Sequence, residues 1–379
     1  MVSASRGRPR QNGFVSIFTV LFFIVLITVL TFGFMRVMLN EQRQAVNNAL
    51  TASAYNAAEA GVEDAKRALL RYQSLSGGTL KTAYQNALSS TTCPGIAGSS
   101  DVRKDLNLLW DANNKSVQIS NQSAYLESYT CLIIQRNTDD YLGRLTANSS
   151  DLIPLRGAAP FTKVEISWHK TSSDADKIPA GYPLAGELYD TGTWASRGYP
   201  AMLRAQFMEN QQSSFQLNQL DNLNRTVFLQ PVRVGSSVPP TGLSLDTYDP
   251  KSPSPSKNLQ PVSINCSDSA AYACRVIINL DGPMDPGGKL VYLRLSSLYV
   301  GTNFQVRLLD GASRIVPFDG VQPLVDSTGK ANDAFRRVLS RVRLDVTPFY
   351  PAYALEVGNG LCKDLFVGLD ASSYRNNCP

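Results

Sequence analysis

"FVSIFTVLFFIVLITVLTFGFM", from Phe14 to Met35, is an apolar run that contains no Asp, Glu, Lys, Arg, Pro or Asn. As an α-helix rising about 1.5 Å per residue it is about 33 Å long, enough to cross a bilayer hydrocarbon core of about 30 Å. A secretory signal has a shorter apolar region, of about 7–15 residues, followed by a small-residue cleavage site. Residues 35–38 read MRVM instead. The run therefore predicts a transmembrane helix over residues 14–36 and not a signal that is removed after it.

Charged residues on either side of this run predict its orientation. Arg6, Arg8 and Arg10 precede it, and no acidic residue occurs before Glu41. Positive residues close to a span favour the cytoplasmic side of the membrane. We therefore expect a single-pass membrane protein with a cytoplasmic N-terminus and an exoplasmic head.

Helical character continues beyond the predicted span. Residues 37–75 contain no proline, and small or apolar residues recur at helical spacing along one face. These residues are Val46, Leu50, Ala54, Ala57, Gly61, Ala65 and Ala68. A helix of this combined length needs a packing partner, and a seam of small residues allows that partner to approach closely. We predict an amphipathic helical stem over residues 37–75, ending near the SGG sequence at 76–78.

The rest of the chain has the pattern of a β-rich domain. Short alternating runs are separated by clusters of Gly, Pro, Asn and Asp, which predicts half-buried antiparallel strands. In FTKVEISW, residues 161–168, Val164 and Ile166 share one face, and Lys163 and Glu165 share the other. Further strand candidates begin near residues 131, 202, 226, 274, 290, 304 and 338.

These patterns predict an α+β fold, in which a long N-terminal helix packs against a β-rich, antiparallel head. A Pro/Ser-rich stretch at residues 238–257 has the composition of a linker or long loop. We therefore expect a first β-rich region over residues 76–237 and a second over residues 258–379.

Cysteine usage agrees with an exoplasmic head. The six cysteines all follow residue 90 and include no CxxC pair: Cys93, Cys131, Cys266, Cys274, Cys362 and Cys378. An even number without zinc-ligand spacing favours disulfides over a metal site or free thiols in a reducing compartment. Six cysteines allow 15 pairings. Sequence proximity favours Cys93–Cys131, Cys266–Cys274 and Cys362–Cys378, the last of which would close a C-terminal loop.

Several function classes lack support in the sequence. The single histidine, His169, has no second histidine with which to form a metal site, and no G-x-S-x-G, P-loop or G-x-G-x-x-G motif occurs. The glycine-rich turns at residues 280–288 and 326–333 have too few carboxylates at the spacing of a calcium loop. The net charge is only +5, with basic residues scattered, so no nucleic-acid site is indicated. We expect neither catalysis nor a metal or cofactor.

The N-terminal part resembles type IV prepilins. The resemblance rests on a basic leader ending in Gly13, an aromatic residue next, the apolar run, and NNALTASAYNAAEAGVEDAKRAL, which is similar to the stem of minor pilins and pseudopilins. It is specific over residues 1–72 and only architectural beyond them. The resemblance implies a pilin-like fold, a leader over residues 1–13, cleavage by a prepilin peptidase between Gly13 and Phe14, and N-methylation of Phe14. It also implies that the partners are other pilin subunits, the assembly machinery and, before assembly, membrane lipid.

One position departs from the family pattern. Most pilins carry a glutamate at the fifth residue of the processed chain, where it pairs with the N-terminal amine of a neighbouring subunit, but here that position is Phe18. An amine buried without a carboxylate costs free energy. The tip pseudopilin of type II secretion also lacks this glutamate. The resemblance therefore implies a subunit at the tip of a fibre, or one that initiates it.

Two functions from different classes remain open. The first is a non-enzymatic minor pilin or pseudopilin at the cell surface, used for adhesion, motility, DNA uptake or secretion. The second is an anchored ectodomain that stays in the membrane as a binding module. The mass of the mature chain separates them, because only the first begins at Phe14.

Overall fold

The structure is a computed structural model that describes residues 14–120, 126–172, 187–210, 224–233, 242–245, 261–267, 270–284 and 290–344. Gly13, most of the Pro/Ser-rich stretch, and both Cys362 and Cys378 lie outside these residues.

A single long helix begins the described chain, and three short helices follow it. Helix α1 (Phe14–Ser74) has 61 residues and is about 90 Å long. The predicted span and stem are therefore one continuous helix, as the absence of proline predicts. The other helices are α2 (Thr79–Leu88), α3 (Ser100–Asp105) and α4 (Thr191–Ser196), with a 3₁₀ turn at Ile96–Gly98.

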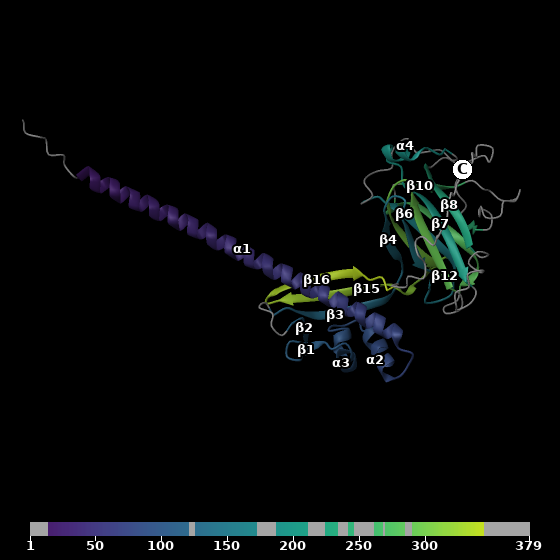
Figure 1. Ribbon diagram of the computed structural model, residues 1–379, viewed down its shortest axis with the longest axis horizontal. Coiled ribbons are helices and arrows are strands. Elements are labelled where there is room, and N and C mark those ends of the chain that lie inside the picture. The colour runs from purple at the N-terminus through teal and green to yellow at the C-terminus, as the bar shows by residue number, and fades with distance from the viewer. Residues whose placement is uncertain are drawn as a thin grey trace, which may run out of the picture.

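A five-stranded antiparallel sheet packs on the C-terminal half of α1 (Figure 1). Its strand order is β1-β2-β3-β15-β16. The strands are β1 (Leu109–Asp111), β2 (Ser116–Gln118), β3 (Ser128–Thr138), β15 (Phe318–Ala331) and β16 (Ala334–Arg341). The buried cluster between this sheet and the helices includes Ala65, Leu69, Tyr84, Ile134 and Val325. We call this part the stem body.

An eleven-stranded sheet forms a second body beyond the stem body, away from the exposed end of α1 (Figure 1). Its order is β14-β13-β6-β11-β10-β8-β7-β12-β5, with β4 also paired to β13 and β9 to β11. The first strands are β4 (Tyr141–Leu145), β5 (Ser150–Pro154), β6 (Phe161–Lys170), β7 (Met202–Asn210) and β8 (Asn224–Arg233). The others are β9 (Leu243–Ser244), β10 (Val262–Cys266), β11 (Tyr272–Met284), β12 (Leu290–Leu298), β13 (Thr302–Leu309) and β14 (Ile315–Val316).

This large sheet curls around its own core. Trp168 of β6 and Leu203 of β7 lie in one buried cluster, although three strands separate β6 from β7 in the sheet. The Trp168 Nε1 atom donates a hydrogen bond of 2.9 Å to the carbonyl oxygen of Ala201. Side chains from distant strands therefore meet across the curled sheet, and we call this part the head body.

The division of the head differs from the predicted one. Strands from both sides of residues 238–257 belong to the same eleven-stranded sheet, so this stretch does not separate two β-rich regions. The boundary falls elsewhere, because β4 to β14 are inserted in the chain between β3 and β15, which pair with each other. The stem sheet is thus built from residues on both sides of the head body.

Polar contacts join the two bodies where the chain crosses between them. Arg341 of β16 pairs with Asp140, which lies between β3 and β4, at 2.6 Å. The Gln322 side chain accepts a hydrogen bond from the Leu142 N–H at 2.9 Å and donates one to the Leu142 carbonyl at 2.8 Å. These bonds connect β15 and β16 of the stem body to β4 of the head body.

The α+β class and the β-rich, largely antiparallel head are confirmed. Two strand pairs are exceptions, since β10 pairs with β8, and β9 with β11, in parallel. The prediction of a half-buried FTKVEISW strand is wrong on one face. Glu165 and Ser167 are also buried, because β6 lies between β13 and β11 inside the sheet.

Candidate functional site

The predicted processing site lies at the start of α1. Gly13 is outside the described residues, and α1 begins at the next residue, Phe14. Phe18, the residue at the position of the usual glutamate, lies on this first part of the helix with 68% of its surface exposed.

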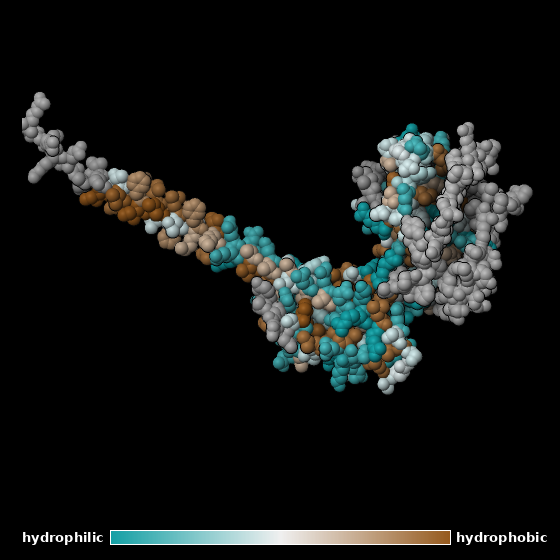
Figure 2. Space-filling view, viewed as in Figure 1, coloured by the Kyte–Doolittle hydropathy of each residue, from teal (hydrophilic) through white to brown (hydrophobic). Residues whose placement is uncertain are grey.

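The N-terminal half of α1 is an exposed apolar cylinder. All its large apolar residues from Ile17 to Leu39 are exposed, and Phe34 reaches 74%. Figure 2 shows this part of the helix as a brown, hydrophobic segment that projects from the rest of the molecule. By length and composition, α1 is the one helix of the described chain that could cross a membrane. Such a surface needs lipid or other protein to cover it.

Two threonine hydroxyl groups of this segment are bonded within the helix. Thr28 Oγ1 donates to the Ile24 carbonyl at 2.5 Å, and Thr31 Oγ1 donates to the Ile27 carbonyl at 2.7 Å. In a bilayer core, polar groups must find partners inside the protein. These two threonines therefore do not disturb an apolar environment.

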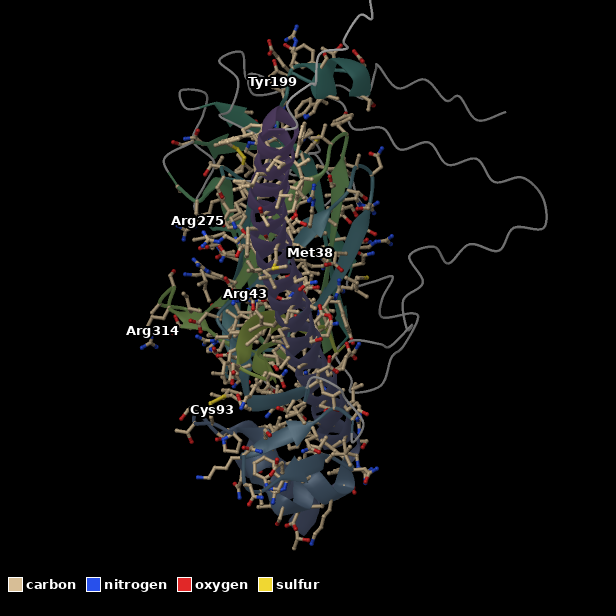
Figure 3. The ribbon with its side chains drawn as sticks, turned by 90° about the vertical axis from the view of Figure 1, so that its left-hand side faces the viewer. Met38, Arg43, Cys93, Tyr199, Arg275 and Arg314 are labelled. Carbon is tan, nitrogen blue, oxygen red and sulfur yellow. A yellow bond between two sulfur atoms is a disulfide. The ribbon has the colours of Figure 1, made fainter. Side chains whose placement is uncertain are left out.

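The helix changes character at its first charged residues. Arg36, Glu41 and Arg43 follow the apolar segment, and the surface turns from hydrophobic to hydrophilic there (Figure 2). Met38 and Arg43, labelled in Figure 3, lie within this transition. If α1 spans a membrane, the boundary between lipid and water falls at this transition.

A seam of small residues brings α1 into direct backbone contact with the stem sheet. A Cβ atom added at Gly329 of β15 would lie 2.1 Å from the carbonyl oxygen of Ala54 and 2.3 Å from the amide nitrogen of Ala58. One added at Gly61 would lie 2.3 Å from Ser327 Oγ. At Gly329 the overlap is with helix backbone, so only glycine allows this separation, whereas at Gly61 the Ser327 hydroxyl would have to move. The predicted small-residue face therefore packs on the sheet from Ala54 onward, whereas Val46, at its start, is 55% exposed.

Charged and phenolic groups fasten the end of α1 to α2 and α3. Arg71 donates two hydrogen bonds to the Asp105 carboxylate, at 3.0 and 3.2 Å, and Tyr84 Oη donates a third at 2.7 Å. The Arg71 guanidinium and, after it, the Tyr84 hydroxyl hold the pKa of Asp105 below its ordinary value. Burial, reinforced by Asp105, raises the pKa of Tyr84. Both groups therefore keep their neutral-pH charge states, which these bonds require.

A similar contact joins the middle of the stem to β3. Tyr129 Oη donates to Asp64 Oδ2 at 2.9 Å, and Arg67 pairs with the same carboxylate at 2.6 Å. Burial, with the Asp64 charge as a second cause, raises the pKa of Tyr129. Because Asp64 and Arg67 are one helical turn apart, the contact also fixes the rotation of α1 on the sheet.

Two disulfides occur among the described residues. Cys93 bonds to Cys131 across 38 residues, and Cys266 bonds to Cys274 across 8 residues. These are two of the three pairs that sequence proximity favours. The first joins the segment after α2 to β3, and the second joins β10 to β11. The proposed third pair, Cys362–Cys378, lies outside the described residues.

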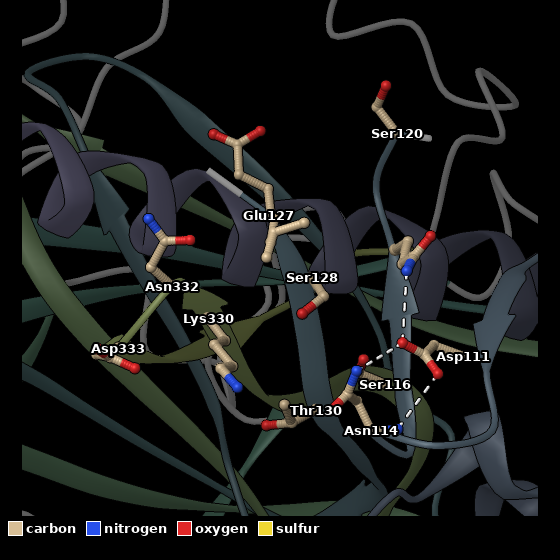
Figure 4. A pocket seen from close by; sticks show the side chains of 12 residues that line it. Asp111, Asn114, Ser116, Ser120, Glu127, Ser128, Thr130, Lys330, Asn332 and Asp333 are labelled. Carbon is tan, nitrogen blue, oxygen red and sulfur yellow. Dashed lines mark hydrogen bonds between the residues drawn. The ribbon is translucent and has the colours of Figure 1, made fainter. Parts of the chain in front are cut away.

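A polar pocket of about 540 Å³ lies at one end of the stem sheet (Figure 4). Three chain segments enclose it: the β1–β2 hairpin, the start of β3 and the β15–β16 hairpin. Its lining residues are Asp111, Asn114, Ser116, Gln118, Ser120, Leu126, Glu127, Ser128, Thr130, Lys330, Asn332 and Asp333. We call it the hairpin pocket.

His169 and the glycine-rich stretch at residues 326–333, both singled out in the sequence, lie in different sheets. His169 is buried at the end of β6, and its backbone N–H donates to Thr302 Oγ1 at 3.0 Å. No group of three or more His, Cys, Asp or Glu residues that could hold a metal is found within the described ranges. The sequence 326–333 is mainly strand, since β15 continues to Ala331, and only its end forms a turn.

The hairpin pocket could hardly be predicted from the sequence. Lys330 and Asp333 lie in a stretch that we interpreted as an ordinary turn, and Ser128 lies about 200 positions earlier in the chain. Polar residues at alternate positions of a strand are the only local signal. Their convergence depends on the pairing of β3 with β15, which no local pattern specifies.

No protein-family model matches this chain, and neither does any curated protein or solved structure.

Proposed function

We propose that this protein is a minor subunit of a type IV pilus or a related secretion pseudopilus. Its helix α1 first holds the subunit in the membrane and then packs against the helices of other subunits. The stem and head bodies are then carried on the outside of the fibre. The role is structural and non-enzymatic.

The observation that carries the proposal is the division of α1 into two halves. The N-terminal half is apolar and exposed on all sides, whereas the C-terminal half is a small-residue seam buried on an antiparallel sheet. The exposed apolar half of α1 can be covered either by lipid or by other apolar helices. A subunit that moves from a membrane into a fibre needs such a surface. The basic leader and Gly13 that precede it are the residues that a prepilin peptidase would read.

We further propose that the subunit occupies an end of the fibre. With Phe18 in place of a glutamate, the chain offers no carboxylate to a neighbour's N-terminal amine in the apolar core. A subunit repeated along the shaft would leave one such amine unpaired at every contact. A subunit at the end has a neighbour on one side only.

The competing function is a permanently anchored ectodomain that binds a partner at the cell surface. The exposed apolar segment supports this function equally well, because lipid alone can cover that segment. In that case the protein keeps residues 1–13 and never enters a fibre. Intact-mass measurement of the protein purified from membranes separates the two, since the first requires a chain that begins at Phe14.

The test uses co-expression of the full chain with a prepilin peptidase. We expect Gly13→Leu to remain uncut and to be absent from sheared fibres, because the peptidase reads the residue before the cleaved bond. Gly7→Leu, a matched change in the same leader, should be processed normally. Normal maturation of Gly13→Leu would refute the peptidase assignment and leave the anchored ectodomain as the better account.

A further inference from the structure

The hairpin pocket opens on the face of the stem sheet opposite α1. Tyr129 and Gly329 are partners in the β3–β15 ladder, and both contact the helix. Side chains alternate along a strand, so the next pair, Ser128 and Lys330, faces away from α1. Figure 4 shows the lining side chains gathered over the sheet, with α1 behind it. The pocket is therefore independent of the surface that the helix uses.

Uncommitted polar groups line the floor of this pocket. Ser116 and Ser128 are only 3% and 5% exposed, and their hydroxyl groups bond to no described residue. Lys330 forms no ion pair within the described chain, and its ammonium group lies 5.5 Å from the centre of the Phe335 ring. None of these three polar groups is among the enclosed side-chain atoms that lack a partner in the described chain, so each is open to the cavity. These groups are therefore available to a ligand.

One carboxylate of the pocket is already occupied. Asp111 accepts hydrogen bonds from the backbone N–H groups of Asn113 and Asn114, at 2.9 and 3.2 Å, and from the Asn114 side chain at 2.7 Å. These donors, led by the Asn114 side chain, hold the pKa of Asp111 below its ordinary value. Asp111 thus shapes the β1–β2 turn and has little capacity left for a ligand.

The remaining groups exclude most ligand classes. The lining contains a single large apolar side chain, Leu126, so an apolar ligand finds no matching surface. A divalent cation needs several free oxygen ligands, but Asp111 is saturated and Lys330 repels it. A phosphate or sulfate would be attracted by one lysine but repelled by the carboxylates of Asp111, Glu127 and Asp333. A neutral ligand that both donates and accepts hydrogen bonds fits all of these groups.

We propose that the hairpin pocket binds a neutral saccharide. Lys330 and Asn332 supply donors, while Asp333 and the hydroxyls of Ser116 and Ser128 supply acceptors, in a cavity of small-molecule size. The proposal does not rest on the assembly role, because a permanently anchored ectodomain carries the same pocket. It deepens either function by naming the chemistry of a surface partner.

The experiment measures saccharide binding to the full chain in phosphatidylcholine nanodiscs, because sugar-based detergents would compete. Saturation-transfer NMR is run with a panel of glucose, galactose, N-acetylglucosamine and their disaccharides. We expect at least one of them to bind, and Lys330→Met to weaken its binding by about tenfold or more. Lys104→Met, which changes an exposed lysine of α3, should bind as the wild type does.

A second variant protects the test from a folding defect. Asp333→Asn changes a side chain that bonds to no described residue, so it should leave unfolding unchanged while altering saccharide affinity. Three results would overturn the proposal: no binding from the panel, equal binding by the wild type and both pocket variants, or binding of calcium, phosphate or lysine amide in place of the sugars. None of these results bears on cleavage at Gly13, so this proposal and the assembly role fail separately.

Discussion

Asp105 illustrates at the scale of a residue how this fold is held together. It ends α3, accepts hydrogen bonds from Arg71 of α1 and Tyr84 of α2, and has 20% of its side chain exposed. Because its pKa is lowered in the folded state, its ionised form stabilises the fold above its ordinary pKa of about 4. That contribution is lost as the pH falls through the lowered folded-state value.

We therefore predict a pH-dependent effect of Asp105→Asn. At pH 7 the variant should lose about 1–2 kcal/mol of unfolding free energy, a modest figure because Arg71 is partly exposed to solvent. The difference from wild type should shrink as the pH falls from about 4 toward the lowered folded-state pKa, because the carboxylate of the unfolded wild type takes up its proton first. Denaturant unfolding of the full chain in micelles at pH 7, 5 and 3 measures it.

Asp101→Asn on the same short helix is the control and should be close to neutral, since within the described residues Asp101 accepts a side-chain hydrogen bond only from its neighbour Ser100. A penalty for Asp105→Asn that is as large at pH 3 as at pH 7 would mean that shape, and not charge, matters at this position.

The two faces of β6 differ in how well the sequence predicts their burial. The alternation of FTKVEISW correctly placed Val164 and Ile166 together on the core face. It also placed Glu165 on an open face, but its side chain is only 3% exposed and pairs with Arg275 and Arg307. A single strand cannot reveal that its polar face lies between neighbours that carry arginines. That information resides in β11 and β13, more than 100 positions away.

At the scale of the element, α1 packs closely on β15 because Gly329 has no side chain at the point of contact. We predict that Gly329→Ala destabilises the stem body by about 1–3 kcal/mol, because its Cβ would overlap the backbone of Ala54 and Ala58. Backbone atoms of a helix cannot rotate away as a flexible side chain does, so the helix must shift as a unit. Thermal unfolding of the full chain measures the loss.

Gly311→Ala is the matched control, since a Cβ at that position meets nothing within 4 Å. A loss of stability for Gly329→Ala no larger than for this control would show that the seam is looser than the structure indicates.

The elements themselves were largely predictable. The apolar run and the proline-free stem predicted a helix ending near residue 75, and α1 ends at Ser74. The seam residues Ala54, Ala57 and Ala65 are fully buried, as their spacing predicts. The identity of the sheet that covers them was not predictable. Gly329 carries no signal in its own neighbourhood that marks it as the contact point of a helix more than 250 positions earlier.

At the scale of the whole molecule, the insertion of the head body into the stem body could not be predicted from the sequence. Composition placed a boundary at residues 238–257, where proline and serine are abundant. The actual crossings are short and ordinary in composition, at residues 139–140 between β3 and β4 and at Pro317 between β14 and β15. Bonds such as Arg341–Asp140 then join the two bodies at these crossings. A boundary that is crossed twice by short connections leaves no trace of a linker.

The proposed position at a fibre end is also a property of the whole molecule. Packed helices exclude water, so an N-terminal ammonium among them needs a carboxylate or must lose its proton. This chain can place its own amine beside a neighbour's glutamate, but Phe18 offers none in exchange. The pairing is then possible on one side of the subunit only.

We therefore predict a few copies per fibre, all at fibre ends, and fewer fibres or weaker adhesion when the protein is deleted. Immunogold labelling against the head body tests this directly, because that body lies far from the apolar segment of α1 and remains accessible (Figure 1). Phe18→Glu is the informative variant, since restoring the carboxylate should allow label to appear along the shaft as well. Continuous decoration by the unaltered protein would refute the end position, because it would show that shaft subunits tolerate an unpaired N-terminal amine.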